Sequence, residues 1–264
     1  MNAETVAHYR SWFTRFVQDH AEQNEQDQQN IVLKDAHTRQ VCGNARRIAA
    51  ELGLDERASL LAETIALFHD VGRFPQYRRY RTFQDSRSKN HAVLGAQVLL
   101  ERDVLRDLPA RERSLIVRAV TLHNIFILPQ GLDGELLLQA KLVRDADKLD
   151  IWRVFTELLE TNTSDWPSAA SLGLPDTPEH SAGVLDSLER RDMVQLSSLR
   201  ALNDFKLLQL AWIYDLNFLP SLRMVVERSV IDRLSATIPQ TPRVMQALGN
   251  LRQYVAGRLA GTAA

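Results

Sequence analysis

Phe68-His69-Asp70-Val71-Gly72-Arg73 is the stretch around which the chain is organised. It follows a run of apolar residues with helical spacing over 58–68, which begins just after a capping residue at Asp55. We therefore expect a largely buried helix that ends at this stretch, where Gly72 and then Pro75 stop it. A histidine and an aspartate side by side at the end of a buried helix predict a metal site.

The composition is that of an ordinary globular protein. The 264 residues are 45% hydrophobic, which is enough for one large core or two modest ones. A formal net charge of -1 gives no general attraction to polyanions, so nucleic acid is not an expected partner. No apolar run approaches the roughly 18 residues of a membrane helix, so no membrane span is expected.

The cysteine content and the N-terminus bear on the cellular compartment. Cys42 is the only cysteine, which excludes an intrachain disulfide. The first residues have neither the basic region nor the apolar region of a secretory leader. We therefore expect the protein in a reducing cytoplasm.

Helical periodicity extends along most of the chain, and strand signals are scarce, so the predicted fold class is all-α. A polar run over 22–30 is either a loop or a solvated helix extension. The predicted helices span 3–20, 31–52, 55–68, 91–102, 110–123, 135–161, 185–197, 201–217, 219–237 and 241–259.

Three segments follow from this pattern. Residues 1–160 are predicted to form a metal-binding helical domain. Residues 161–184 contain three prolines and two glycines, which is typical of a linker or a surface excursion. Residues 185–264 are predicted to form a C-terminal helical extension that packs on the bundle. The helix over 201–217, which contains Trp212, is expected to belong to the core or to a dimer surface. A homodimer is therefore one of the expected oligomeric states.

The candidate metal ligands are distributed one per predicted helix or helix end. A single histidine on an apolar face is more often a hydrogen-bonded core residue than a ligand. Helix bundles, however, build metal sites from inward-facing side chains on different helices, and a buried carboxylate costs several kcal/mol unless a cation compensates it. The set consists of His37, His69, Asp70, His91, His123 and Asp147.

The order of these residues and the strings around them resemble the HD-domain superfamily of metal-dependent phosphohydrolases. His-Asp-Val-Gly-Arg at 69–73 is similar to the pattern HD-[I/V]-G-[K/R] of that family. Asn-His-Ala-Val-Leu-Gly at 90–95 resembles its second histidine motif, and Arg-Asp-Ala-Asp-Lys-Leu-Asp at 144–150 resembles its closing aspartate motif. The resemblance covers about residues 31–155 and implies an HD-type helical bundle.

The resemblance also implies roles for the ligands. It assigns one metal ion to the minimal set of His37, His69, Asp70 and Asp147. The additional His91 and His123 resemble the ligands of a second ion in dinuclear members, in which the residue matching Asp70 bridges both ions. Mixed imidazole and carboxylate ligands favour Fe or Mn, with Ni, Co and Zn as alternatives.

Two further aspartates compete with Asp147 for the ligand role. If 135–161 is helical, Asp147 and Asp150 share a face, and Asp150 is placed to orient a ligand histidine. Asp145 then points elsewhere. We expect Asp145 and Asp150 to support the ligands or the structure and not to bind metal.

A basic segment follows the His-Asp pair and is predicted to be a long loop over 73–90 with at most a short turn of helix. Its cations are Arg73, Arg78, Arg79, Arg81, Arg87 and Lys89. Phosphate needs cationic partners, so Arg73 and one or two of Arg78, Arg79 and Arg81 are predicted to bind substrate phosphate. The alternative is a solvated surface loop with ordinary ion pairs. Asp70, Arg73 and Lys148 are the predicted catalytic residues, although an ordinary ion pair explains Lys148 equally well.

The function implied by the resemblance is hydrolysis of a small phosphorylated compound, such as a nucleotide or a related phosphomonoester or diester. A metal-activated hydroxide at a mono- or dinuclear site would attack phosphorus. A mixed-valent di-iron oxygenase with the same six ligands is one alternative. A non-catalytic nucleotide sensor or assembly subunit is the other.

Overall fold

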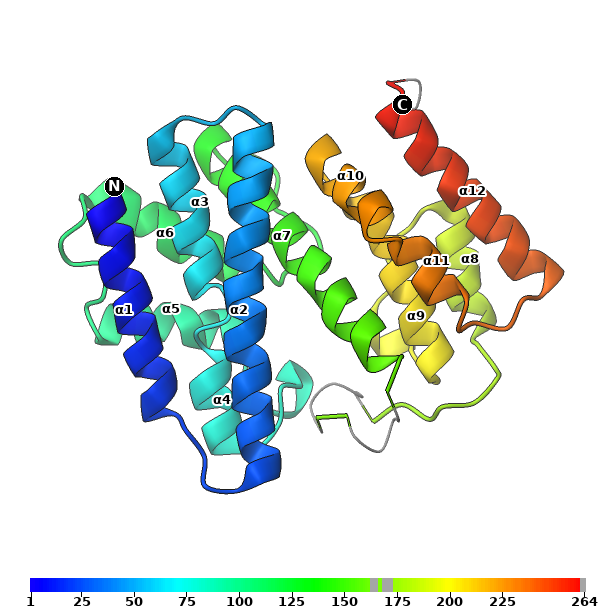
Figure 1. The fold of residues 1–264 in the computed structure, drawn as a ribbon, viewed down its shortest axis with the longest axis horizontal. Coiled ribbons are helices and arrows are strands. Elements are labelled where there is room, and N and C mark those ends of the chain that lie inside the picture. The colour runs from blue at the N-terminus through cyan, green and yellow to red at the C-terminus, as the bar shows by residue number, and fades with distance from the viewer. Residues whose placement is uncertain (162–165, 168–172, 262–264) are drawn as a thin grey trace. The chain divides into compact units, whose positions relative to one another are not determined.

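The structure is a computed structural model in which residues 1–161, 166–167 and 173–261 are described. The described residues form helices and contain no strand, which confirms the all-α prediction (Figure 1). The first helices are α1 (Ala3–Asp19), α2 (Glu25–Glu51), α3 (Glu56–Phe68), α4 (Arg73–Tyr80), the short 3-10 helix η1 (Asp85–Arg87), α5 (His91–Glu101), α6 (Ala110–Leu122) and α7 (Gly134–Leu158).

The chain divides into two compact units. One consists mainly of Met1–Asp150, and the other begins at Ile151, so the division falls within α7. Of the predicted linker over 161–184, residues 162–165 and 168–172 lie outside the described residues. Trp166, which is described, is buried edge-on against Phe155 in the second unit.

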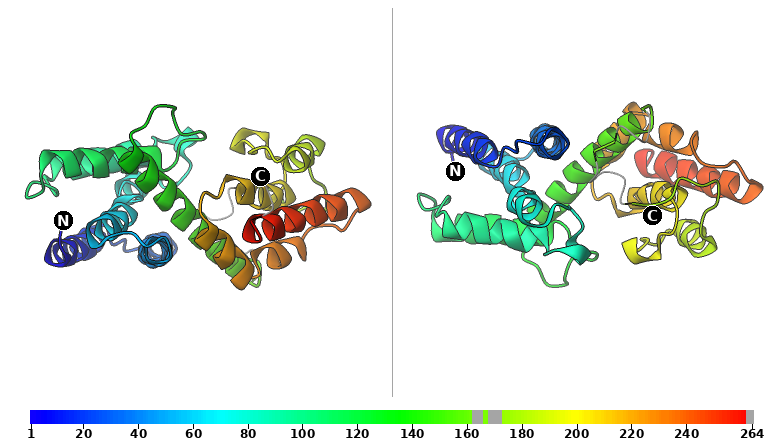
Figure 2. Two further views of the ribbon diagram at one scale, coloured as in Figure 1. Left: turned by 90° about the horizontal axis from the view of Figure 1, so that it is seen from above. Right: turned by 90° about the horizontal axis from the view of Figure 1, so that it is seen from below.

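Helix α3 is the centre of the first unit. Every residue from Leu61 to Phe68 is buried, as the apolar run predicts. Figures 1 and 2 show α3 between α1 and α2, and it contacts both. The ring of Phe68 packs edge-on against Tyr9 of α1, with 5.5 Å between ring centroids. This burial fixes the end of α3, where the His-Asp pair lies.

The turn after α3 depends on Gly72. A Cβ at this position would overlap the carbonyl oxygen of His91 and the backbone nitrogen of Gly95, so only glycine fits. The backbone after Asp70 therefore lies directly against the first turns of α5. The prediction that Pro75 helps to stop a helix is wrong. Pro75 lies in the first turn of α4, where its missing N–H costs nothing.

The prediction of a loop over 73–90 is wrong for its first eight residues, which form α4. The helix is held by contacts distant in sequence. The hydroxyl of Tyr77 donates to Asp27 at 2.7 Å and accepts a hydrogen bond from Asn30 at 2.9 Å. Both partners belong to α2, which begins at Glu25 after the capping side chain of Asn24. The alternative of a helix extension over the polar run 22–30 is therefore confirmed from Glu25 onward.

The second unit contains the remaining helices. They are α8 (Ala182–Arg190), the 3-10 helices η3 (Leu196–Ser198) and η4 (Trp212–Asp215), α9 (Leu202–Ala211), α10 (Leu219–Glu227), α11 (Val230–Ser235) and α12 (Pro242–Leu259). Every residue of α9 is buried, so α9 is the centre of this unit. The predicted helix over 219–237 is interrupted at Ser229, whose φ of 49° separates α10 from α11. Among the described residues, no helix is long and apolar enough to cross a membrane.

Candidate metal centre

The six predicted ligands come from five helical elements of the first unit. His37 lies in the middle of α2, and Asp147 lies in α7. His69 and Asp70 follow the last residue of α3, His91 is the first residue of α5, and His123 follows α6. All are buried except Asp147, whose side chain is 18% exposed. The structure therefore brings together residues that are up to 110 positions apart in sequence.

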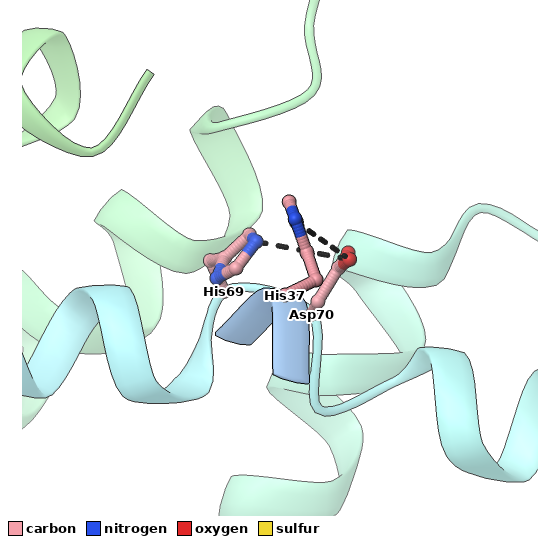
Figure 3. A group of neighbouring side chains, drawn as sticks. All are labelled: His37, His69 and Asp70. Carbon is pink, nitrogen blue, oxygen red and sulfur yellow. Dashed lines mark ion pairs between the residues drawn. The ribbon is translucent and has the colours of Figure 1, made fainter. Parts of the chain in front are cut away.

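One group of donor atoms comes from His37, His69 and Asp70, which lie within 4.8 Å of one another (Figure 3). The Nε2 atoms of both histidines are 3.7 Å from Oδ2 of Asp70. Oδ1 of Asp147 lies 3.0 Å from Nε2 of His37 and 3.6 Å from Nε2 of His69. We call these four residues the first donor group.

A second group uses the other side of the same carboxylate. Asp70, His91 and His123 also place donor atoms within 4.8 Å of one another. Oδ1 of Asp70 is 3.3 Å from Nε2 of His91 and 3.8 Å from Nε2 of His123. We call these three residues the second donor group. Asp70 belongs to both groups and presents one oxygen to each.

The other ring nitrogen of each histidine has an oxygen partner. Nδ1 of His69 is 2.7 Å from the carbonyl oxygen of Ala66, and Nδ1 of His123 is 2.7 Å from that of Val120. Carbonyl oxygens only accept, so these two Nδ1 atoms carry the proton. Each ring therefore keeps the lone pair of Nε2 for the centre.

For the rings of His37 and His91, the oxygen partner of Nδ1 is a carboxylate. Nδ1 of His37 donates to Asp150 at 2.7 Å, and Nδ1 of His91 donates to Asp85 at 2.8 Å. Such hydrogen bonds fix the ring orientation and increase the basicity of the opposite nitrogen, as they do in metal sites. Asp150 thus lies where a residue that orients a ligand histidine is expected.

The lone pairs in the centre fit a divalent metal. Nε2 of His37 and Nε2 of His69 are buried, and their nearest polar neighbours in the centre are the carboxylates of Asp70 and Asp147, which donate no proton when ionised. Nε2 of His91 and Nε2 of His123 are only 3.0 Å apart, although both are acceptors when Nδ1 holds the proton. Acceptors that face one another without a donor are unfavourable unless a cation lies among them. Imidazoles with carboxylates are the donor set of transition metals.

The two carboxylates of the centre are held in the ionised form. Burial acts to raise the pKa of Asp70, but Lys34, His69 and Arg73 keep that pKa well below its usual value. Burial acts in the same way on Asp147, and the adjacent imidazoles of His37 and His69 keep its pKa well below the usual value. Both side chains are therefore ready to bind a cation at neutral pH.

The imidazoles differ in their protonation. Burial, together with the neighbouring rings of His91 and His69, lowers the pKa of His123 to about 3. Burial and then the Arg73 guanidinium lower the pKa of His91. In His37, burial and Lys34 act to lower the pKa, but Asp147 and Asp150 outweigh them and raise it. The imidazoles of the second donor group are therefore uncharged at neutral pH, whereas in the first group His37 can hold a second proton.

Two residues of the centre were not singled out from the sequence. Nζ of Lys34 lies 2.7 Å from Oδ2 of Asp70. Asp85 accepts from His91 and also contacts Gln76 at 2.8 Å and Arg73 at 3.1 Å. The sequence carries one signal for Lys34, because it precedes His37 by three residues and shares its face of α2. Asp85 is the single acid among the cations of 73–90.

The predicted phosphate-binding arginines lie in different environments. Arg73 is half-buried, contacts Asp70 at 3.3 Å and is held by Gln76 and Asp85. Arg78 and Arg79 are exposed on α4. Arg81 pairs with Glu22 at 2.9 Å and with Asp27 at 3.3 Å, which fastens the end of α4 to the start of α2. Of the four, Arg73 is the one in contact with the donor groups.

The closing motif lies on α7. Lys148 and Asp145 are buried on either side of Asp147, and Asp150 is buried against His37. Arg144 of the same helix donates to the carbonyl oxygen of His123 at 3.2 Å. This contact ties the residue after α6 to α7.

Comparison with known proteins gives one match. The family model of the HD domain matches residues 35–152, a range that contains all six predicted ligands. No curated protein and no solved structure matches the sequence significantly.

Proposed function

Residues 35–152 form an HD domain, and from this premise we propose that the protein is a metal-dependent phosphohydrolase of the phosphatase or phosphodiesterase type. HD domains are in general metal-dependent phosphohydrolases. The proposed substrate is a small phosphorylated compound, such as a nucleotide or a related phosphomonoester or diester. The proposed cofactor is two divalent ions, with Fe or Mn favoured by the mixed nitrogen and oxygen donors.

The observation that carries this proposal is the arrangement of four imidazoles around one carboxylate. Each ring has an oxygen partner at Nδ1 and directs Nε2 towards Asp70. Asp70 is shared by two groups of donors. Two adjacent cations bridged by one carboxylate are the arrangement that hydrolyses phosphate esters in many unrelated enzymes.

The residues of the chain have separate tasks in this reaction. When bound, the metal ions supply a water of lowered pKa and neutralise charge that develops on phosphorus. Asp150 and Asp85 keep His37 and His91 in the tautomer that binds metal. Arg73, beside Asp70, is placed to contact a phosphate oxygen.

The test is metal analysis combined with a panel of phosphorylated metabolites. We expect purified protein to contain about two transition-metal ions per chain and to release phosphate or cleave a diester when Mn²⁺ or Fe²⁺ is present. Oxygen consumption with ferrous iron and no phosphate release would favour the oxygenase. A nucleotide complex that persists unhydrolysed with Mn²⁺ bound would favour the sensor.

We also propose a reducing cytoplasmic compartment, on the evidence of the cysteine. Cys42 is the only cysteine in the sequence and is buried. Burial raises the pKa of its thiol to about 12, so the thiol is not reactive at neutral pH.

A further inference from the structure

Lys34 is a cation at the edge of the metal centre to which the proposed chemistry gives no role. It lies one turn before His37 on α2, and its Nζ is 2.7 Å from Oδ2 of Asp70. This is the carboxylate oxygen that His37 and His69 face at 3.7 Å. The ammonium group therefore competes for the same oxygen that the first donor group would offer to a metal ion.

Lys34 and Arg73 both contact Asp70, but they are held differently. The guanidinium of Arg73 also donates to Gln76, to Asp85 and to the carbonyl oxygen of Phe83. Within the described part of the chain, the only ion pair of Lys34 is the one with Asp70, and the ring of Phe83 lies 5.5 Å from its Nζ. Arg73 is fixed in place, whereas Lys34 can turn away by rotation of its flexible stem.

The surroundings of Lys34 allow such a movement. Its side chain is 17% exposed, so the ammonium group lies at the edge of the centre and not in its interior. A divalent ion bound to Oδ2 of Asp70 would repel an ammonium group at hydrogen-bond distance from the same oxygen. Metal binding would therefore weaken the contact between Lys34 and Asp70.

We propose that Lys34 exchanges partners, neutralising Asp70 before metal binds and holding a phosphate oxygen of the substrate afterwards. This inference rests on the proposed function, since it assigns a role to Lys34 at the same site. A phosphomonoester brings about two negative charges, which is more than the single positive charge of Arg73 can balance. Once Asp70 binds metal, Lys34 loses its ion pair with this carboxylate, and its ammonium group can then bind a phosphate oxygen.

The first half of the test measures Mn²⁺ binding to metal-free protein by calorimetry at fixed pH. Lys34→Gln removes the competing charge and keeps a helix-forming side chain, so we expect it to bind Mn²⁺ about tenfold more tightly than wild type. Lys34→Arg keeps the charge and should bind as wild type does. Lys89→Gln is the matched control for loss of a positive charge elsewhere in the same unit, and its affinity should be unchanged. Circular dichroism melting verifies that each variant is folded.

The second half measures the binding of inorganic phosphate to the Mn²⁺-loaded proteins. We expect about tenfold weaker phosphate binding by Lys34→Gln and a change of less than about threefold in Lys34→Arg and Lys89→Gln. Opposite effects on metal and on phosphate are not produced by a merely structural role. Unchanged or weaker Mn²⁺ binding by Lys34→Gln overturns the proposal, and so does unchanged phosphate binding.

These measurements test the partner exchange by Lys34 separately from the proposed phosphohydrolase activity. Neither readout requires turnover. Wild type that binds Mn²⁺ and phosphate but hydrolyses no phosphorylated compound would refute the hydrolase and leave the exchange by Lys34 intact. Active wild type with unaltered binding in Lys34→Gln would refute the exchange alone.

Discussion

The two donor groups of the centre share Asp70 but are built differently. In the first group, His37 lies inside a long helix and is oriented by Asp150, which is buried in α7. In the second group, His91 is oriented by Asp85, whose side chain is 31% exposed and lies in the short helix η1. Two ligands of the first group, His37 and Asp147, therefore lie inside helices, whereas both histidines of the second group lie at helix ends.

The groups also differ in charge. The first contains two carboxylates, from Asp70 and Asp147, whereas the second contains Asp70 alone. Affinity for a divalent cation increases with the number of ionised ligands around it. We therefore expect the first group to bind its ion more tightly than the second, and the predictions below test this order.

The largest effect is expected for the residue that both groups share. Asp70→Ala removes the oxygens that face all four imidazoles, so both ions should be lost, and phosphate release should fall by at least about a thousandfold. Metal content by mass spectrometry and turnover measured on the same sample check this. A variant that retains one full ion would show that the groups do not depend on a common carboxylate.

Loss of one group at a time should separate the ions. His123→Ala should leave about one ion per chain, held by the first group, and His37→Ala should reduce the affinity of that tighter ion instead. Titration with Mn²⁺ distinguishes the two results, because the tight step should persist in His123→Ala and disappear in His37→Ala. The reverse pattern would invert the comparison between the groups.

A smaller effect is expected when the ligands stay and their supporting carboxylates change. Asp85→Asn should weaken the second ion by about 10- to 100-fold and leave the first nearly unchanged. Asp150→Asn is the matched variant and should weaken the first ion by a similar factor. Equal losses of affinity for both ions in either variant would mean that Asp85 and Asp150 do not support the two donor groups independently.

The smallest effect concerns pH. Because the pKa of His37 is raised, the proton on this ring must leave before metal binds, so affinity at the first group should fall by about tenfold for each pH unit below that pKa. The pKa of His123 is lowered to about 3 and that of His91 is also lowered, so between about pH 5 and pH 8 affinity at the second group should change less than affinity at the first. Mn²⁺ titrations of His123→Ala and His37→Ala across this range measure each group by itself.

The features predicted from sequence are those with a local signal. Helix α3 has a capping aspartate at one end and an unbroken apolar run, and its observed bounds differ by one residue from those predicted. Four of the six candidate ligands, His69, Asp70, His91 and Asp147, lie in short strings that resemble a known family, and His37 and His123 were added from their order along the chain. The structure brings donor atoms of these residues together.

The features that were missed depend on contacts between distant residues. Helix α4 has no apolar periodicity and is rich in arginine, so its sequence favours a loop. Its helical form is supported by Tyr77, which is 50 residues from its partner Asp27. Lys34 and Asp85 likewise carry no motif. The spacing of Lys34 from His37 places it on the same helix face, but its contact with Asp70 and that of Asp85 with His91 follow only from the tertiary structure.

The close approach of Gly72 to Gly95 joins two parts of the centre through the main chain. Gly72 follows Asp70 by two residues, and the backbone it lies against belongs to the helix that begins with His91. A side chain at Gly72 would push α5 away from the turn after Asp70, so it would also move His91 away from the carboxylate that both donor groups share.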